Sequence, residues 1–318
     1  MFNREFKSLL EFVKVFGKDE DCIAHLEELY WEGVPISPFK KDSKVYMCAN
    51  GKYRCAETKK YFTVKNGTMF DGTKINLPTW FLAIYLVTSL KRGISSPQLA
   101  VELKISQKSA WFMLQRIRAC CEKENMQPME GIVEADEALV GGRNKNRHKN
   151  KRFKGTGGRS TIDKDAIFGM VERESGRIVL VNVPDCESES LQPIIKKLVV
   201  SGSVFITDSW SAYNGLENDY LAYQIKDTDK GYQNDYNPEI HTNTIEGAWK
   251  HIKAAISGTG THNHIATKHL QLYLHERAFI YNLRKNDNDY KFNHLLCNGD
   301  VRTKYRELTN DKITGKPN

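Results

Sequence analysis

The sequence predicts a mixed α/β protein in which a layered domain of strands and helices follows a small β ribbon and a helical region. Three patterns indicate this. Strands alternate with helices from Gly131 to about Ser257, short β segments with Asn-Gly turns fill residues 35–71, and apolar residues recur at helical spacing between Leu77 and Lys123. With 318 residues, of which 40% are hydrophobic, the chain is long enough for about two to three domains with real cores.

Charge and cysteine content narrow the class of protein. There are 47 Lys and Arg against 39 Asp and Glu, a net charge of +8, which favours a polyanionic partner such as nucleic acid. Seven scattered cysteines, with Cys120 and Cys121 adjacent, argue against a disulfide framework and favour a reducing compartment. The N-terminus does not have the pattern of a signal peptide, and the most apolar stretch, "WFLAIYLV", is too short to span a bilayer. We expect a cytosolic protein with no membrane role.

The first two segments are expected to be small. Residues 1–34 have the apolar spacing of two short amphipathic helices, and we assign them as a helical lead-in. Residues 35–72 carry the β segments "KVYMCA", "KYRCAE" and "KYFTVK", broken by Asn-Gly turns at Asn50 and Asn66. We expect these segments to form a small antiparallel ribbon.

Residues 73–128 predict a helical, DNA-binding region. The stretch "LPTWFLAIYLVTSL" forms a first helix, "SSPQLAVELK" a second that Ser95 or Ser96 caps, and "QKSAWFMLQRIRACCEK" a third after a tight turn. The last two helices are typical of a helix-turn-helix, although any three-helix bundle has the same spacing. The candidates for exposed phosphate or base contacts on the last helix are Gln107, Lys108, Gln115, Arg116 and Arg118.

Residues 129–260 alternate strands with helices and form the predicted α/β domain. The expected strands are "GIVEADEALVGG", a hairpin in "AIFGMVERESGRIVLVNV", "SVFITDS" and "LAYQIK". The expected helices are "ESLQPIIKKLVV" and "NTIEGAWKHIKAAIS". Residues 261–318 add one more helix, about 265–285, and a polar tail.

Two acidic residues lie on these strands where a carboxylate needs an explanation. Asp136 lies within the first strand, flanked by Glu134 and Glu137, where strands favour apolar or β-branched residues. Alternation that turns Glu134 and Asp136 toward solvent would explain them without a site. Asp208 ends the apolar strand "SVFITD", at the carboxyl end where α/β sheets hold their sites, although an Asp there also starts turns.

A third carboxylate, Glu246, opens the last helix of this domain. In "HTNTIEGAWKHIK", Asn243 fits a helix N-cap, and Glu246, three residues on, fits its capping-box partner. An ion pair with Lys250 is a further structural explanation. Together with Asp136 and Asp208, however, Glu246 completes a set that comes from two strands and one helix N-terminus of a single α/β unit and converges on a site of hard oxygen ligands.

Several ordered motifs over roughly residues 30–285 resemble one family. The run from "GTMFDGTKINLPTW" to "SAWFMLQRIR", then "VEADEALVGGRNKNRHKNKR", "ITDSWSAY", "HTNTIEGAWKHIK" and "THNHIATKHLQLYLHERAFIYNLR", looks like that of the ISXO2-like, Merlin-related insertion-sequence DDE transposases. The resemblance implies an RNase H-like catalytic core with Asp136 and Asp208 as the first two metal-binding acids. Glu246 is the third by position, although some members use the Asn of the same motif, here Asn243.

The resemblance also implies cut-and-join DNA transposition. Two Mg²⁺ or Mn²⁺ ions held by carboxylates can activate a water or a DNA 3′-hydroxyl for in-line displacement. The implied partners are double-stranded DNA, as transposon terminal repeats and target, and further copies of the chain in a homodimer or larger synaptic complex. The implied location is the bacterial cytosol, in association with the nucleoid. Two alternatives are a DNA-binding protein that has lost cleavage and an RNase H-like nuclease that cuts without joining.

A basic run and an aromatic residue flank the predicted site. Within "GGRNKNRHKNKRFKG" the candidate phosphate contacts are Arg143, Lys145, Arg147, Lys149, Lys151 and Arg152. Charge runs are usually solvated loops, but directly after a strand with a catalytic acid we expect phosphate binding that weakens steeply with salt. Trp210, just past Asp208, is a candidate for stacking on an unpaired base, and so is Tyr213, with packing into the core as the alternative.

The ribbon departs from the family pattern. Relatives carry two CxxC-type pairs there, which are a zinc signature when intact. Here the corresponding stretches are "SPFK" and "CAET", so that only Cys55 of the four ligands is kept, and Cys48 lies at a different position. We therefore expect no structural zinc and a ribbon held by packing alone.

Overall fold

The structure is a computed structural model that describes residues 4–141, 148–152, 164–225, 237–256, 260–262 and 265–310. The chain divides into two compact units, Met1–Cys121 with Lys285–Asn318, and Glu122–Arg284. The division into five domains that the sequence suggests remains a prediction. No helix in the described part of the chain is long and apolar enough to cross a membrane.

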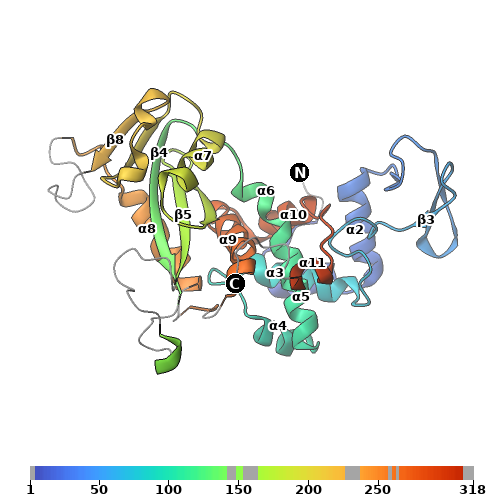
Figure 1. The fold of residues 1–318 in the computed structure, drawn as a ribbon. Helices are drawn as coiled ribbons and strands as arrows, with labels where there is room; N and C mark the ends of the chain where they lie inside the picture. Colours follow the sequence, from blue (N-terminus) through green and yellow to red (C-terminus); the bar gives the residue numbers. More distant parts are fainter. Residues whose placement is uncertain are drawn as a thin grey trace. The chain divides into compact units, whose positions relative to one another are not determined.

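The first unit combines helices with one small sheet (Figure 1). The helical lead-in is confirmed as α1 (Leu9–Val15) and α2 (Asp19–Trp31). The antiparallel ribbon is confirmed as β1 (Val45–Met47), β2 (Tyr53–Cys55) and β3 (Tyr61–Phe62), with η1 (Ala49–Gly51) in the first Asn-Gly turn. The unit continues with α3 (Leu77–Ser89), α4 (Ser96–Leu103) and α5 (Gln107–Cys120), and ends with α10 (Asn288–Cys297) and α11 (Tyr305–Thr309).

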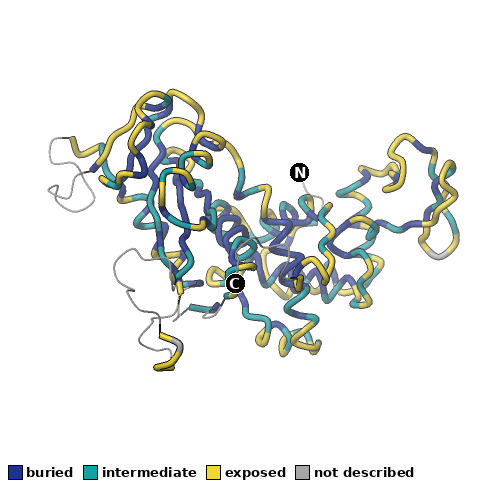
Figure 2. Tube along the Cα trace, in the orientation of Figure 1, coloured by how far each residue is buried: buried dark blue, intermediate teal, exposed yellow. Residues whose placement is uncertain are grey.

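Aromatic rings from both ends of the chain form a core in this unit. The Phe292 ring of α10 lies 5.2 Å from Phe12, 5.5 Å from Phe16 and 5.4 Å from Phe81 of α3, measured between ring centroids. All four rings are buried. Buried stretches alternate with exposed ones along the helices of this unit (Figure 2). The sequence predicted a polar tail after residue 285, but burial of Phe292 instead orders part of it as α10.

Hydroxyl groups surround Cys55 at the end of the ribbon. The Cys55 thiol is buried and donates to Ser43 Oγ over 3.2 Å. Hydrogen bonds with Ser37, then with Ser43 and Thr58, lower the pKa of Cys55 to about 6. Ser37 and Thr58 stand where relatives are expected to carry zinc-ligating cysteines, so polar side chains occupy part of that place.

The second unit is built on a mixed sheet. Within its described residues the strand order is β6 (Arg177–Val183), β5 (Asp165–Glu172), β4 (Ile132–Val140), β7 (Val204–Asp208) and β8 (Leu221–Ile225). The pairs β6–β5 and β5–β4 are antiparallel, whereas β4–β7 and β7–β8 are parallel. An antiparallel meander extended by parallel strands is the topology of an RNase H-like core, and the predicted fold class is confirmed.

Helices cover both faces of this sheet (Figure 1). On one face Val133 and Ala135 pack in a core with α7 (Ser188–Leu198), η4 (Ser211–Tyr213) and η5 (Leu216–Asn218). On the other, Ala138 and Val140 pack with α8 (Asn243–Ile256) and α9 (Thr267–Asn282). The short α6 (Glu122–Asn125) contacts α9 and β6. Because β4 is covered on both faces, a solvent-facing side for Glu134 is ruled out, and that interpretation was wrong.

Candidate functional site

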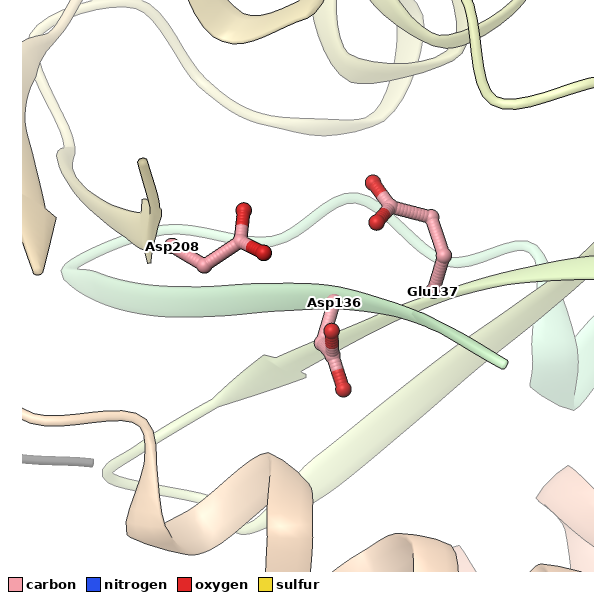
Figure 3. A group of neighbouring side chains, drawn as sticks. All are labelled: Asp136, Glu137 and Asp208. Atoms are coloured by element: carbon pink, nitrogen blue, oxygen red, sulfur yellow. The ribbon is translucent and has the colours of Figure 1, made fainter. Parts of the chain in front are cut away.

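Asp136 and Asp208 come together because their strands are parallel neighbours. Glu134 of β4 pairs with Ile206 of β7. Asp136 and Asp208 each lie two residues further along, so they stand side by side where the two strands end their pairing. Ligand oxygens of Asp136, Asp208 and Glu137 lie within 4.8 Å of one another (Figure 3). The two strand acids therefore meet, as the sequence predicted.

Glu137 joins this group although it was not among the predicted site residues. Asp136 and Glu137 project to opposite sides of β4, beside Asp208 (Figure 3). The buried hydroxyl of Tyr213 in η4 donates to Glu137 Oε1, so Tyr213 belongs to the core and not to a stacking surface. The adjacent acids in "ADE" are the sequence feature that could have indicated Glu137. Strand alternation argued against it, because neighbouring side chains on a strand point to opposite faces.

The Asp136 carboxylate is held in a poorly solvated position among like charges. Trp249 Nε1 of α8 donates to Asp136 Oδ2 over 2.9 Å. Burial raises the pKa of Asp136 to about 6, and the charges of Glu246 and Asp208 act in the same direction. Bringing repelling carboxylates together is unfavourable without a cation, which makes the group a candidate metal site.

Glu246 lies beside the three-acid group without being part of it. Among the described residues its oxygens do not join the cluster within 4.8 Å, yet its charge raises the pKa of Asp136. Helix α8 begins with Asn243, which is exposed. The N–H groups of Thr244 and Ile245 donate to Glu134 Oε2, over 2.9 Å each. The N-cap interpretation of Asn243 was wrong, because the capping oxygen comes from the sheet.

A glycine in β5 admits the Trp249 ring that holds Asp136. Gly169 pairs with Asp136 across β4 and β5. A Cβ at Gly169 would lie 2.7 Å from Trp249 Cζ2 and 3.4 Å from Ile245 Cδ1. We therefore expect Gly169→Ala to push α8 away from the sheet and to lower stability by about 1–3 kcal/mol, measured by chemical denaturation.

Gly247 provides the control for that prediction. It lies in α8, and a Cβ there would meet no atom within 4 Å among the described residues. Gly247→Ala is expected to stabilise the protein by about 0.5–1 kcal/mol, since alanine favours a helix. Equal stability of the wild type and Gly169→Ala would contradict the close packing of Trp249.

The candidate DNA contacts on α5 divide into two groups. Gln107 and Lys108, at the start of the helix, are exposed as predicted. Gln115, Arg116 and Arg118 are buried, and their predicted exposure was wrong. Arg116 lies in the interior because its guanidinium donates to the carbonyl groups of Met69, Asp71 and Thr303, over 2.8 to 3.0 Å.

The other nucleic-acid candidates are placed as follows. Arg143, Lys145 and Arg147 lie outside the described residues. Lys149 and Lys151 lie in η3 (Lys149–Lys151), and Arg152 follows directly; Lys149 and Arg152 are exposed. Trp210 is half-buried against the α7 core, and its Nε1 donates to Cys186 O over 2.8 Å. These contacts favour the packing alternative for Trp210 over base stacking.

Comparison with known proteins identifies relatives of this domain. Residues 128–282 match the family of the ISXO2-like transposase domain. A Halobacterium salinarum protein with the description "Uncharacterized protein in transposable element ISH50" is 26% identical over 279 residues, which cover 84% of this chain and 91% of that protein.

Two solved structures resemble the chain more distantly. The piggyBac transposase synaptic complex with hairpin DNA has a TM-score of 0.38 at 11% identity, covering 99% of this chain and 86% of that one. The Mos1 mariner paired end complex with Mn has a TM-score of 0.27 at 11% identity, covering 63% and 70%.

Proposed function

We propose that the chain, whose residues 128–282 match the ISXO2-like transposase domain, is an insertion-sequence transposase that cleaves transposon ends and joins them to target DNA by metal-dependent phosphodiester chemistry. One observation carries the proposal. Within the family-matched segment, two aspartates from parallel neighbouring strands bring their carboxylates within 4.8 Å at the carboxyl end of β7.

The donor set fits hard divalent cations. Asp136 and Asp208 supply carboxylate oxygens, the ligands that Mg²⁺ and Mn²⁺ prefer, and Glu246 is the proposed third acid. Ions held by these residues would supply activation of an attacking hydroxyl and stabilisation of the leaving oxygen in an in-line displacement. Glu137 is a further candidate ligand by its place in the group.

The residues around the acids fix the geometry of the site. Trp249 holds one Asp136 oxygen by a hydrogen bond, so the other oxygen can face the cluster. On the opposite face of β4, Tyr213 orients Glu137 in the same manner. Asp208 Oδ1 accepts from Trp210 N over 3.1 Å, which fixes its rotamer at the strand end. Acids held in this way need little reorganisation when a substrate phosphate arrives.

DNA is the proposed partner, and exposed lysines are its proposed contacts. We expect Lys108→Ala in α5 to weaken DNA binding, to lower the slope of log affinity against log salt by about 1, and to leave the melting temperature unchanged. Arg116→Ala is the contrasting variant, expected to cost about 2–4 kcal/mol of stability because it leaves buried carbonyl groups without a donor. Binding titrations measure the DNA affinity of the two variants, and thermal melts measure their stability. If a folded Arg116→Ala protein lost DNA affinity while Lys108→Ala kept it, the assignment of Lys108 as the DNA contact would be contradicted.

Because two DNA ends must be joined together, we propose that the chain acts as a homodimer or a larger synaptic complex. The test uses the purified full-length protein, Mg²⁺ or Mn²⁺, and labelled DNA from the ends of its element. Cleavage and joining, both lost in Asp208→Asn, support the transposase. Binding without cleavage supports the DNA-binding alternative, and cleavage without joining supports the nuclease. Cleavage that persists in Asp208→Asn would refute the metal site.

A further inference from the structure

We propose that Glu134 is a positioning residue, which holds the first turn of α8 and thereby sets where Glu246 stands relative to Asp136 and Asp208. The proposal rests on the proposed function, because it concerns the third acid of that site. It assigns a role to a carboxylate two residues before Asp136 on the same face of β4.

Glu134 is 0% exposed, and its oxygens are fully engaged. Oε2 accepts the N–H groups of Thr244 and Ile245, over 2.9 Å each. Oε1 lies 2.9 Å from both Nε and Nη2 of Arg173 and 3.3 Å from His241 Nδ1. Two backbone N–H groups bind one oxygen of this fully buried carboxylate and a guanidinium binds the other, which separates its role from that of Asp136.

Arg173 completes the attachment of the chain just before α8. Its Nη1 donates to Glu239 O over 2.8 Å, and its Nη2 donates to His241 O over 3.0 Å. Glu134 therefore binds amides at the start of α8, while Arg173 binds carbonyl groups of the segment that leads into it. Carbonyl and amide groups on both sides of Asn243 are thus tied to the centre of the sheet.

A second contact fixes the rotation of α8 one turn later. Trp249 donates to Asp136 Oδ2 over 2.9 Å, and its ring packs over Gly169. Glu246 follows Ile245, which Glu134 holds, and precedes Trp249, which Asp136 holds. A helix attached at two points four residues apart can neither slide nor rotate freely, so the position of Glu246 beside Asp136 is determined by these contacts.

The charge of Glu134 is required, and not only its shape. Two backbone N–H groups and a guanidinium face its oxygens, and the N-terminus of a helix favours an anion. In Glu134→Gln the amide NH₂ would face one of these donor sets, and Arg173 would lose its carboxylate partner in the interior. We expect the first turn of α8 to loosen and Glu246 to move away from the cluster.

The experiment compares Glu134→Gln with Glu172→Gln in the full-length protein. Glu172 is also a buried carboxylate, lies on the neighbouring strand β5, and has Glu130, Ser175 and Arg177 as partners outside α8. Both variants are expected to lose stability. Only Glu134→Gln is expected to raise the Mn²⁺ concentration for half-saturation, measured by electron spin resonance of free Mn²⁺, by about 10–100-fold. Its kcat for cleavage should fall similarly, with KM for DNA unchanged.

Hydrogen exchange of peptides covering residues 243–250 gives a readout independent of activity. Faster exchange in Glu134→Gln, together with weaker Mn²⁺ binding, supports the positioning role. Faster exchange with wild-type Mn²⁺ affinity, or Mn²⁺ affinity equal to that of Glu172→Gln, overturns it. If Glu134→Gln does not fold, Arg173→Lys takes its place, because lysine keeps the positive charge but loses the forked contacts. Arg173→Lys is expected to show faster exchange and weaker Mn²⁺ binding, both to a smaller extent. Wild-type Mn²⁺ binding by Arg173→Lys would overturn the positioning role of Glu134. A wild-type protein that neither binds Mn²⁺ nor cleaves refutes the proposed function itself, before any variant is made.

Discussion

Asp136→Asn is expected to abolish DNA cleavage and to raise the melting temperature of the metal-free protein at about pH 7.5. The carboxylate is desolvated and surrounded by like charges, which raise its pKa from 3.8 to about 6. Asparagine removes the charge and still accepts from Trp249. The change should stabilise the fold by about 1–3 kcal/mol, or roughly 2–10 °C.

The gain in stability from Asp136→Asn should be larger at high pH than at low pH. The folded protein holds the Asp136 proton more tightly than the unfolded chain, so wild-type stability decreases as the pH rises from about 4 to about 6, and the full penalty remains above that. The advantage of Asp136→Asn should therefore vanish near pH 4. Thermal melts in EDTA measure this, and added Mg²⁺ should stabilise the wild type but not the variant. A lower melting temperature for the variant at about pH 7.5 would contradict the proposed repulsion.

The sequence predicted the acids better than it predicted their surroundings. Asp136 could be singled out because it is a charged residue within a strand, and Asp208 because it ends an otherwise apolar strand. What the pattern of strands could not show is that β4 and β7, separated by more than sixty residues, are parallel neighbours in a register that aligns Ile206 with Glu134. Family resemblance supplied that arrangement, and local periodicity did not.

The interpretations that were wrong share one physical cause. Polar side chains were expected at the surface, but Glu134, Arg116 and Arg118 are buried. Glu134 and Arg116 find partners in backbone groups of segments distant in sequence. Local spacing describes neighbours along the chain, whereas the burial of a charge is decided by donors and acceptors that folding brings to it. The same limitation made Asn243 look like the cap of α8, because the actual cap comes from a strand more than a hundred residues earlier.

Glu246→Gln is expected to lower the cleavage rate by at least about 100-fold, whereas Asn243→Ala should change it less than about threefold. The difference follows from their surroundings. The charge of Glu246 acts on Asp136, while Asn243 is exposed at the first helical position and the start of α8 is held by Glu134 instead. Single-turnover cleavage of labelled end DNA at saturating Mg²⁺ measures the rates.

The matched control for this comparison is Glu239→Gln, which neutralises an exposed carboxylate just before α8 and should leave cleavage unchanged. Glu137→Gln is expected to have an intermediate effect on cleavage, since Glu137 lies within the acidic group and is oriented by Tyr213.

If Asn243→Ala abolished cleavage and Glu246→Gln did not, the third ligand would be the amide of Asn243. Asn243 precedes Glu246 by three residues, so helix α8 would then have to shift by nearly one turn, and its first turn could not keep both amide bonds to Glu134. The contacts of Glu134 are thus the reason to expect the carboxylate and not the amide as the third member of the site.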